Sequence, residues 1–377
     1  MIERVALIMA GGGGTRLWPV SSAARPKPLI TGLGAENATL LGSTVARLQG
    51  VVPFDRIFVV TTESLRQATL RALPELTEEQ VIGEPAGRNT AACIALALIH
   101  LRYLLIDRGD ASVEKPDDLS ILVLPADHHI EDVDTFRKHL DAAFFYAETR
   151  QQIVTLGIAP VRPDTGFGYI ERESTAFARE KGKSDILAYP ATRFVEKPDR
   201  ERAEQYLESG RYLWNAGIFA LPMARVEQDF ARLCPTIWPR FHPIRAAMLA
   251  ESGVQKAIDE AYAEMPSHAI DTAIMEKLND LCVIPLSVGW DDVGSWASLT
   301  SILSKDDHGN VNIQIDSGNT MLDDCRGCMV WNEQGELAVV GVEDLVVVVT
   351  NQKVLVCSKA KAQEVRRVAQ QMNKKQE

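Results

Sequence analysis

Short apolar runs alternate with amphipathic segments over the first 300 residues. Residues 5–9, 57–60, 119–124 and 153–156 are rich in β-branched residues and leucine, and helical patterns lie between them at 40–48 and 89–105. Such runs are typical of strands buried on both faces of a sheet. Their alternation with helices predicts an α/β fold with a mixed, mainly parallel sheet. In such sheets, ligands bind beyond the carboxyl ends of the strands.

The pattern changes after about residue 310. Short β-rich runs follow at 310–315, 328–331, 337–340, 345–349 and 354–357, with turn signals at 316–319 and 332–335. Residues 361–372 have a helical pattern, and the last five residues are polar. We therefore predict two domains, residues 1–305 and a smaller β-rich domain of residues 306–377. The β runs have no clear fixed period, so spacing alone does not establish a β-solenoid.

The charge balance excludes some classes of partner. The chain has 40 Lys+Arg and 51 Asp+Glu, a net charge of -11, whereas general nucleic-acid binders are basic. An acidic protein that binds phosphates must do so locally, through backbone N–H groups, a few cations and a metal ion. The most apolar helical pattern, residues 91–105, contains His100 and Arg102 and is too short to span a membrane. The N-terminus has no signal-peptide pattern, so we expect a cytoplasmic protein without a membrane partner.

The cysteines do not predict a disulfide framework. Six cysteines in a chain of 377 residues are too few for one. Cys325 and Cys328 have the spacing of zinc ligands, but no second Cys or His pair accompanies them. Two thiols that line a β-rich core are the better interpretation.

A glycine run follows the first predicted strand directly. Gly11, Gly12, Gly13 and Gly14 allow the backbone to approach a phosphate closely, with Arg16 and Lys27 as candidate cations. The dinucleotide fingerprint needs a third glycine where Arg16 stands or one residue later, which argues against a dehydrogenase. The P-loop needs Gly-Lys-Ser/Thr, which is also missing. The alternative is a glycine-rich turn that binds nothing.

Two carboxylates follow predicted strands far apart in the sequence. Asp127 comes after the run at 119–124, and Asp292 lies in a turn after residues 282–286. Such a pair suits Mg²⁺ that is shared with substrate phosphates, although a lone aspartate there also suits a helix cap. His128 and His129 suggest zinc, but adjacent residues of an extended segment point apart and do not easily ligate one ion.

Three polar stretches have the chemistry of a sugar site. Residues 165–171 carry glycines and a tyrosine, residues 194–198 place an acid beside a base, and residues 213–219 carry an amide. Each alone matches a turn or a surface pair. Together they offer the paired hydrogen bonds that distinguish hydroxyl groups.

These motifs resemble those of bacterial mannose-1-phosphate guanylyltransferases, which belong to the sugar nucleotidyltransferase superfamily. The matching segments are GGGGTRLWP (11–19) with Pro26 and Lys27, EPAGRNT (84–90), PADH (125–128), FVEKP (194–198), WNAGI (214–218), IDTAIMEK (270–277) and WDDVGSW (290–296). The resemblance implies a Rossmann-like catalytic domain followed by a left-handed β-helix-like domain that helps the enzyme to dimerise. The chain is similar to the single-function form, which has no phosphomannose isomerase domain.

The resemblance also implies the roles of individual residues. Residues for the GTP phosphates are Gly11, Gly12, Gly13, Gly14, Thr15, Arg16 and Lys27, and those for the guanine nucleotide are Glu84, Arg88, Asn89 and Thr90. Asp127 and Asp292 would hold Mg²⁺, with Mn²⁺ as the alternative ion. Residues for mannose 1-phosphate are Gly168, Tyr169, Glu196, Lys197 and Asn215. Pro28, Ala92 and Cys93 depart from the usual pattern, but no charged group is lost.

The implied activity is the formation of GDP-mannose and diphosphate from GTP and α-D-mannose 1-phosphate by a homodimer. One alternative is a related guanylyltransferase for another sugar 1-phosphate, such as that of a heptose. The other is a non-catalytic regulatory homologue. Such a homologue would be expected to lose Lys27, Asp127 or Asp292, and all three are present.

Overall fold

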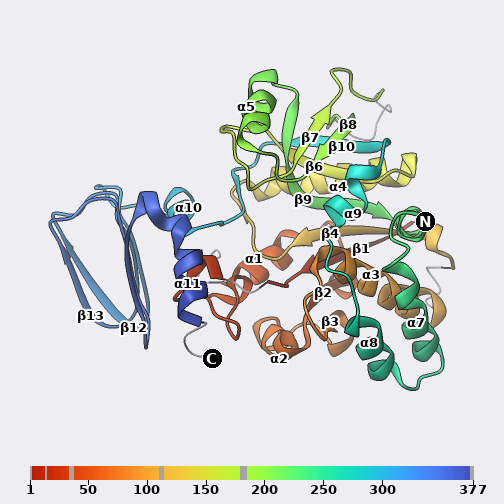
Figure 1. Cartoon of the computed structure of the whole chain (residues 1–377), viewed down its shortest axis with the longest axis horizontal. Helices are drawn as coiled ribbons and strands as arrows, with labels where there is room; N and C mark the ends of the chain where they lie inside the picture. Colours follow the sequence, from red (N-terminus) through yellow and green to blue (C-terminus); the bar gives the residue numbers. More distant parts are fainter. Residues whose placement is uncertain (1, 13–14, 34–37, 110–113, 179–184, 374–377) are drawn as a thin grey trace. The chain divides into compact units, whose positions relative to one another are not determined.

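The structure, a computed structural model, describes residues 2–12, 15–33, 38–109, 114–178 and 185–373 (Figure 1). The chain forms two compact units. Unit 1 comprises Met1–Gly11, Arg47–Pro125 and Asp132–Val288, and unit 2 comprises Gly12–Ala46, Ala126–Glu131 and Gly289–Glu377. Unit 2 therefore combines the glycine-rich segment with the C-terminal residues. The predicted boundary between residues 305 and 306 stays a prediction, since the two units divide the chain at other positions.

Unit 1 is built on a mixed sheet whose nine strands have the order β3-β2-β1-β4-β9-β6-β10-β8-β7. The strands are β1 (Glu3–Met9), β2 (Ile57–Thr62), β3 (Val81–Glu84), β4 (Leu119–Pro125), β6 (Val154–Ile158), β7 (Tyr169–Arg172), β8 (Tyr189–Val195), β9 (Tyr212–Pro222) and β10 (Leu281–Leu286). All four predicted N-terminal strands are confirmed. Parallel pairing joins β3, β2, β1 and β4, and also β6 with β10, whereas the pairs made by β7, β8 and β9 are antiparallel. The sheet is therefore mixed, as predicted, but antiparallel pairs make up a larger part of it than the prediction of a mainly parallel sheet implies.

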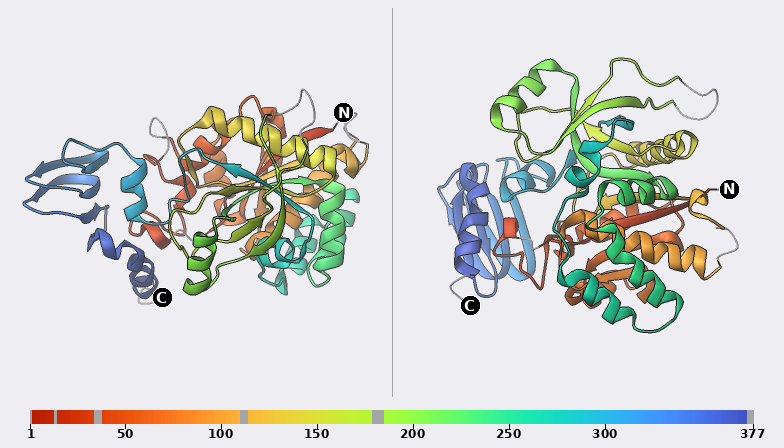
Figure 2. Two further views of the ribbon diagram at one scale, coloured as in Figure 1. Left: turned by 90° about the horizontal axis from the view of Figure 1, so that it is seen from above. Right: turned by 45° about the vertical axis from the view of Figure 1, so that its right-hand side comes forward.

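Helices cover both faces of this sheet (Figures 1 and 2). They are α2 (Glu63–Ala72), α3 (Asn89–Arg102), α4 (Val133–Arg150), α5 (Arg200–Ser209), α6 (Met223–Leu233), α7 (His242–Leu249), α8 (Val254–Ala263) and α9 (Ile270–Ala273). Short 3-10 helices lie at Phe54–Arg56, Glu78–Gln80, Pro116–Asp118, Trp238–Phe241 and Met275–Lys277, and a π-helix at Tyr103–Asp107. Successive side chains of β1 point to opposite faces of the sheet. Val5 and Leu7 join the core formed with α3, α6 and α7.

The helix that begins at Asn89 is longer than its sequence pattern predicts. With the π-helix it spans Asn89–Asp107, whose 19 residues are long and apolar enough to cross a membrane, so the expectation of a segment too short to do so is wrong. Most of this helix, 61% of its most apolar window, is buried inside the protein. Its side chains fill the core of unit 1, which accounts for the apolar composition.

The C-terminal part of unit 2 is a four-stranded sheet of order β12-β13-β14-β15. The elements of unit 2 are the 3-10 helices Thr15–Leu17, Lys27–Leu29 and Lys359–Glu364, the helices α1 (Leu40–Arg47), α10 (Trp296–Ile302) and α11 (Val365–Asn373), and the strands β5 (His129–Ile130), β11 (Trp290–Asp291), β12 (Val311–Asp323), β13 (Met329–Val340), β14 (Leu345–Val349) and β15 (Val354–Ser358). β12, β13 and β14 run parallel, and β15 is antiparallel to β14.

Parallel strands that follow one another through short turns make this sheet solenoid-like. Val311 pairs with Met329 and Met329 with Val346, so a coil takes 17 or 18 residues. The register shifts between Gln314 and Ser317, which hides the period in the sequence. The predicted breaks at 316–319 and 332–335 are wrong, because β12 and β13 continue through them. The predicted C-terminal helix begins as the 3-10 helix and becomes α-helical only at Val365.

The described residues of unit 2 include two hydrophobic cores. The first contains Trp296 and Trp331 together with Leu17, Trp18 and Ile30 of the glycine-rich segment. The second contains Cys325 and Cys328 beside β13 and β14, as predicted for thiols lining a β-rich core. The apolar residues of the glycine-rich segment therefore lie in a core that C-terminal residues help to form.

Candidate active site

The glycine-rich segment of unit 2 begins with exposed backbone. Gly12 has a φ of +134°, which favours glycine, and a Cβ added to Gly11 or Gly12 would meet no atom of the described residues within 4 Å. Thr15 and Arg16 begin the 3-10 helix Thr15–Leu17. Gly13 and Gly14 lie outside the described residues. Contacts of this loop with phosphates stay a prediction.

A two-stranded antiparallel ribbon in unit 2 brings the two predicted metal-binding carboxylates close together. In it, Asp291 of β11 pairs with His129 of β5. Asp292 follows Asp291, while Asp127 precedes His129 by two residues, so antiparallel pairing leaves them at the same end of the ribbon. The sequence placed both carboxylates after strands, and this pairing explains how residues so distant in sequence meet.

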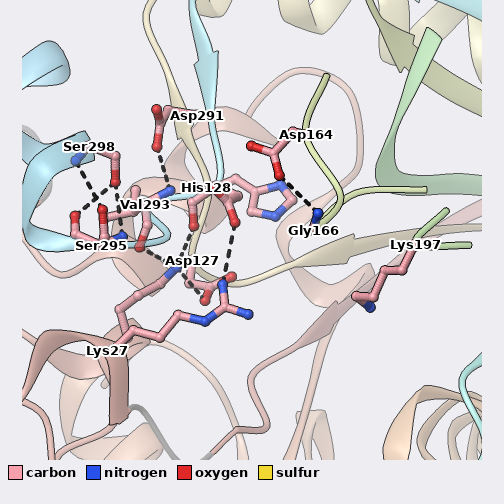
Figure 3. A network of polar contacts seen from close by, with 12 residues as sticks. Lys27, Asp127, His128, Asp164, Gly166, Lys197, Asp291, Val293, Ser295 and Ser298 are labelled. Atoms are coloured by element: carbon pink, nitrogen blue, oxygen red, sulfur yellow. Dashed lines mark hydrogen bonds and ion pairs between the residues drawn. The ribbon is translucent and has the colours of Figure 1, made fainter. Parts of the chain in front are cut away.

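Lys27 holds the two carboxylate-bearing segments together (Figure 3). Its Nζ lies 2.7 Å from Asp127 Oδ2 and donates to the carbonyl oxygens of Asp292 at 2.5 Å and Val293 at 3.3 Å. Its side chain is only 11% exposed. An ammonium has three donor hydrogens, and these three acceptors use all of them. In this structure Lys27 therefore orients both segments, and its contact with a phosphate stays a prediction.

The turn after β11 gives its two aspartates different surroundings. Asp291 Oδ1 accepts a hydrogen bond from the backbone N–H of Val293 at 2.7 Å, and Val293 has a φ of +50°. A β-branched residue in this region is strained, and the bonds to Asp291 and Lys27 hold it there. The carboxylate of Asp292 instead faces Arg16, with Oδ2 3.6 Å from its guanidinium nitrogen.

Asp127 and Asp292 fit a hard divalent cation of the Mg²⁺ type. Both are partly exposed carboxylates, and such an ion is commonly bound by one or two carboxylates together with substrate phosphates. Burial raises the pKa of Asp127, but the charge and hydrogen bond of Lys27, together with the charge of Arg16, lower it, so its pKa lies below its usual range. No cluster of three or more Cys, His, Asp or Glu suited to a metal ion occurs among the described residues. His128 instead accepts a hydrogen bond at Nδ1 from Trp290 Nε1, at 3.1 Å.

In unit 1, two of the predicted guanine-binding residues, Glu84 and Arg88, contact the buried tyrosine Tyr262. Glu84 ends β3 and is 3% exposed, and its Oε1 accepts a hydrogen bond from Tyr262 Oη at 2.9 Å. Burial raises the pKa of Glu84 to about 7, although its hydrogen bonds with Tyr262 and Cys93 lower it. Arg88 Nη2 donates to the Tyr262 carbonyl at 3.4 Å, and the buried Nε of Arg88 has no hydrogen-bond partner among the described residues.

Asn89 and Thr90 begin helix α3. Asn89 has a φ of +66°, and its Oδ1 accepts a hydrogen bond from the Thr90 backbone N–H at 2.8 Å. Thr90 Oγ1 in turn accepts a hydrogen bond from the backbone N–H of Ile270 at 2.8 Å. This loop is therefore fixed from a distant part of the chain.

The predicted sugar-phosphate residues of unit 1 gather around Gly168. A Cβ there would lie 2.6 Å from Glu196 Oε2 and 3.3 Å from Asn215 Cβ, so a side chain at this position would displace the Glu196 carboxylate. Glu196 forms an ion pair with Lys197, which has a φ of +48°. Asn215 Nδ2 donates to Asp271 Oδ1 at 2.8 Å. An amide and charged side chains thus come together around Gly168, and such groups can bind hydroxyl and phosphate oxygens.

Tyr169 differs from the other predicted sugar residues. Its side chain is fully buried, and its hydroxyl donates to the carbonyl of Asp164 at 3.0 Å. Asp164 Oδ1 also accepts from the Gly166 backbone N–H (Figure 3), so Asp164 organises the loop before β7. Ligand binding by Tyr169 stays a prediction and would involve its backbone.

Sequence reasoning assigned no role to Tyr262, Asp271 or Glu276. Asp271 and Glu276 belong to the segment IDTAIMEK, for whose residues the resemblance implies no individual role. Burial and the charge of Glu196 raise the pKa of Asp271 to about 6. Tyr262 lies on α8 in no motif, and nothing in the sequence signals its contact with Glu84.

Comparison with known proteins identifies the class. The family described as "Nucleotidyl transferase" matches residues 5–309, and the family described as "MannoseP isomerase/GMP-like beta-helix domain" matches residues 318–372. The chain belongs to the nucleotidyl transferase family, with its mixed sheet and C-terminal β domain.

Within that family, the chain belongs with the mannose-1-phosphate guanylyltransferases. It is 37% identical to enzymes of that name from Salmonella montevideo, over 368 residues, and from Escherichia coli (strain K12), over 370 residues; each alignment covers 97% of this chain and 73% of the relative. It is similar to a crystal structure from Thermus thermophilus described as a mannose-1-phosphate geranyltransferase. That similarity has a TM-score of 0.79 and 34% identity and covers 99% of this chain and 100% of the other.

The raised pKa of Glu84 predicts a pH-dependent stability. Between about pH 4.5 and 7 the folded state keeps a proton that the unfolded state releases, so rising pH lowers the free energy of unfolding. Glu84→Gln cannot titrate. As the pH rises from about 4.5 to 7, the free energy of unfolding of Glu84→Gln minus that of the wild type should therefore increase by about 2–3 kcal/mol. The measurement is urea unfolding at several pH values.

Glu75→Gln is the control for this experiment. Glu75 is exposed, so this variant should follow the wild type at every pH. Parallel stability curves for Glu84→Gln and the wild type would contradict the assignment of a raised pKa to Glu84.

Proposed function

We propose that the chain converts GTP and α-D-mannose 1-phosphate into GDP-mannose and diphosphate. Membership of the mannose-1-phosphate guanylyltransferases supports the reaction class. The observation that carries the proposal is the Lys27 ammonium, which fixes the segments of Asp127 and Asp292 beside Arg16. This is the set of charges that a reaction between two phosphate-bearing anions needs.

A phosphate oxygen of the sugar phosphate would attack the α-phosphorus of GTP in line, and diphosphate would leave. The attacking oxygen is already anionic near neutral pH, so no general base is required, and His128 and His129 have no proton-transfer role. The protein has to align the two anions and neutralise their charge. Asp127 and Asp292 would hold Mg²⁺ or Mn²⁺, which lowers the repulsion between phosphates. Arg16 and the backbone of the glycine loop would bind the nucleotide phosphates.

The residues around Glu84 predict selectivity for guanine. A site with buried polar groups rejects a base that leaves those groups without partners. We expect kcat/KM for GTP to exceed that for ATP and UTP by at least about tenfold. Diphosphate release with each nucleotide and mannose 1-phosphate measures it. Equal rates with UTP would contradict the proposed base selectivity, and a higher rate with another sugar 1-phosphate would contradict the proposed sugar.

The two neighbouring aspartates of the β11 turn should respond differently to substitution. Asp292→Asn removes a charge from the predicted metal site and should lower kcat at least about a hundredfold, with partial recovery at high Mg²⁺ or Mn²⁺. Asp291→Asn keeps an Oδ1 that can accept the Val293 hydrogen bond and should lose less than about tenfold. Steady-state diphosphate release against metal concentration distinguishes them. A reversed order would show that Asp291 holds the metal, and two active variants would rule out the carboxylate pair.

We also propose that the β-rich part of unit 2 forms a homodimer. Its strand β15 lies at the edge of the sheet, where Val354 is 60% and Val356 59% exposed. An apolar edge with unpaired backbone groups tends to associate unless it is covered. Val356→Lys should give a monomer by light scattering at concentrations where the wild type is dimeric. Val161→Lys, at an exposed valine of unit 1, is the control, and an unchanged dimer in Val356→Lys would contradict this interface.

A further inference from the structure

One segment of unit 1 contacts both groups of predicted substrate residues. Residues 262–276 run from the end of α8 through α9 into the 3-10 helix Met275–Lys277. We call this segment the brace. The brace forms hydrogen bonds with Glu84, Arg88 and Thr90 of the predicted guanine set. It also forms hydrogen bonds with Glu196 and Asn215 of the predicted sugar set.

At its first end, the brace fixes the loop between β3 and α3. The Tyr262 hydroxyl donates to the Glu84 carboxylate at 2.9 Å, and the Tyr262 carbonyl accepts from Arg88 at 3.4 Å. Further along, the backbone N–H of Ile270 donates to Thr90 Oγ1 at 2.8 Å, and the His268 carbonyl accepts from the next N–H after Thr90 at 3.1 Å. Tyr262 is 2% exposed, and its bond to Glu84 is buried.

At its second end, the brace sets the orientation of the Asn215 amide. Asp271 Oδ1 accepts from Asn215 Nδ2 at 2.8 Å, while Asn215 Oδ1 accepts from the Gly217 N–H at 2.9 Å. These two bonds distinguish the amide nitrogen from the amide oxygen, and the second Nδ2 hydrogen has no other partner among the described residues. Glu276 Oε1 also accepts from the Glu196 backbone N–H at 2.8 Å.

We propose that the brace positions both sets of substrate-binding residues, with Tyr262 acting on the guanine set and Asp271 on the sugar set. This inference rests on the proposed function. Tyr262 and Asp271 are positioning residues, because they act through Glu84, Arg88 and Asn215. The brace is one continuous segment, so the same stretch of chain sets the alignment of both substrates.

The test uses the full-length protein and separates the two substrates. Tyr262→Phe removes one hydroxyl and should raise KM for GTP about tenfold, with KM for mannose 1-phosphate changed less than about twofold. Asp271→Leu removes the acceptor and should raise KM for mannose 1-phosphate about tenfold, with KM for GTP nearly unchanged. Asp271→Asn keeps an Oδ1 acceptor for the Asn215 amide and should restore most of that loss.

Two matched variants control for general destabilisation. Tyr146→Phe removes another buried hydroxyl, which donates to the Ile186 carbonyl at 3.1 Å, and Asp107→Asn alters another well-buried carboxylate, paired with Arg245. Neither should change either KM. Thermal melting checks that all variants are folded, and if Asp271→Leu does not fold, Tyr262→Phe and Asp271→Asn still test the two ends.

The outcomes distinguish the brace from the proposed reaction. The expected split between substrates, with recovery in Asp271→Asn, supports the brace. Equal shifts for both substrates, or no shifts, overturn it. Affinities for GTP and mannose 1-phosphate, measured separately by calorimetry, should follow the same split without turnover. A wild-type protein that releases no diphosphate would therefore overturn the proposed reaction, while the affinities would still decide on the brace.

Discussion

The buried ammonium of Lys27 is the interaction on which the arrangement of unit 2 depends. It binds one carboxylate and two backbone carbonyls from the turns around Asp127 and Asp292. A charge this well buried is stable only when its donor hydrogens have partners. The segments that contain Lys27, Asp127 and Asp292 therefore stabilise one another's positions. Two nearby carboxylates would otherwise repel each other. Lys27 and Arg16 provide the compensating charge before any ligand binds.

The β-rich C-terminal part of unit 2 also has a direct structural role for the glycine-rich segment. Trp296 Nε1 donates to the Trp18 carbonyl at 3.0 Å, and both indoles lie in the core that contains Trp331. Burial of such large rings contributes several kcal/mol each, by order of magnitude. The glycines themselves provide no side chains for packing. Their backbone therefore depends on apolar neighbours that the last 80 or so residues of the chain provide.

The sequence predicted what depends on local pattern, and it missed what depends on the path of the chain. Buried strands and the carboxylates that follow them were predictable, because a strand end fixes the place of the next residues. Tyr262 was not, since its partner Glu84 is distant in sequence and a tyrosine in an amphipathic helix usually indicates core. The coil period was hidden by the register shift near Gln314. Asp271 stood in a motif, but only its bond to Asn215 suggests what it does.

The electrostatics of the acidic residues explains how a chain of net charge -11 could accept two anions. Ion pairing keeps Asp127 charged, because its pKa lies below its usual range, and a charged carboxylate is what a divalent cation needs. Burial acts in the opposite direction on Glu84 and Asp271, whose pKa values rise to about 7 and about 6. Near neutral pH, Glu84 therefore carries only part of its negative charge. Carboxylates suited to a metal ion stay ionised, while a buried acid of the predicted base loop contributes less to the repulsion of phosphates. Burial and ion pairing thus set the local charge that the net charge of the chain does not reveal.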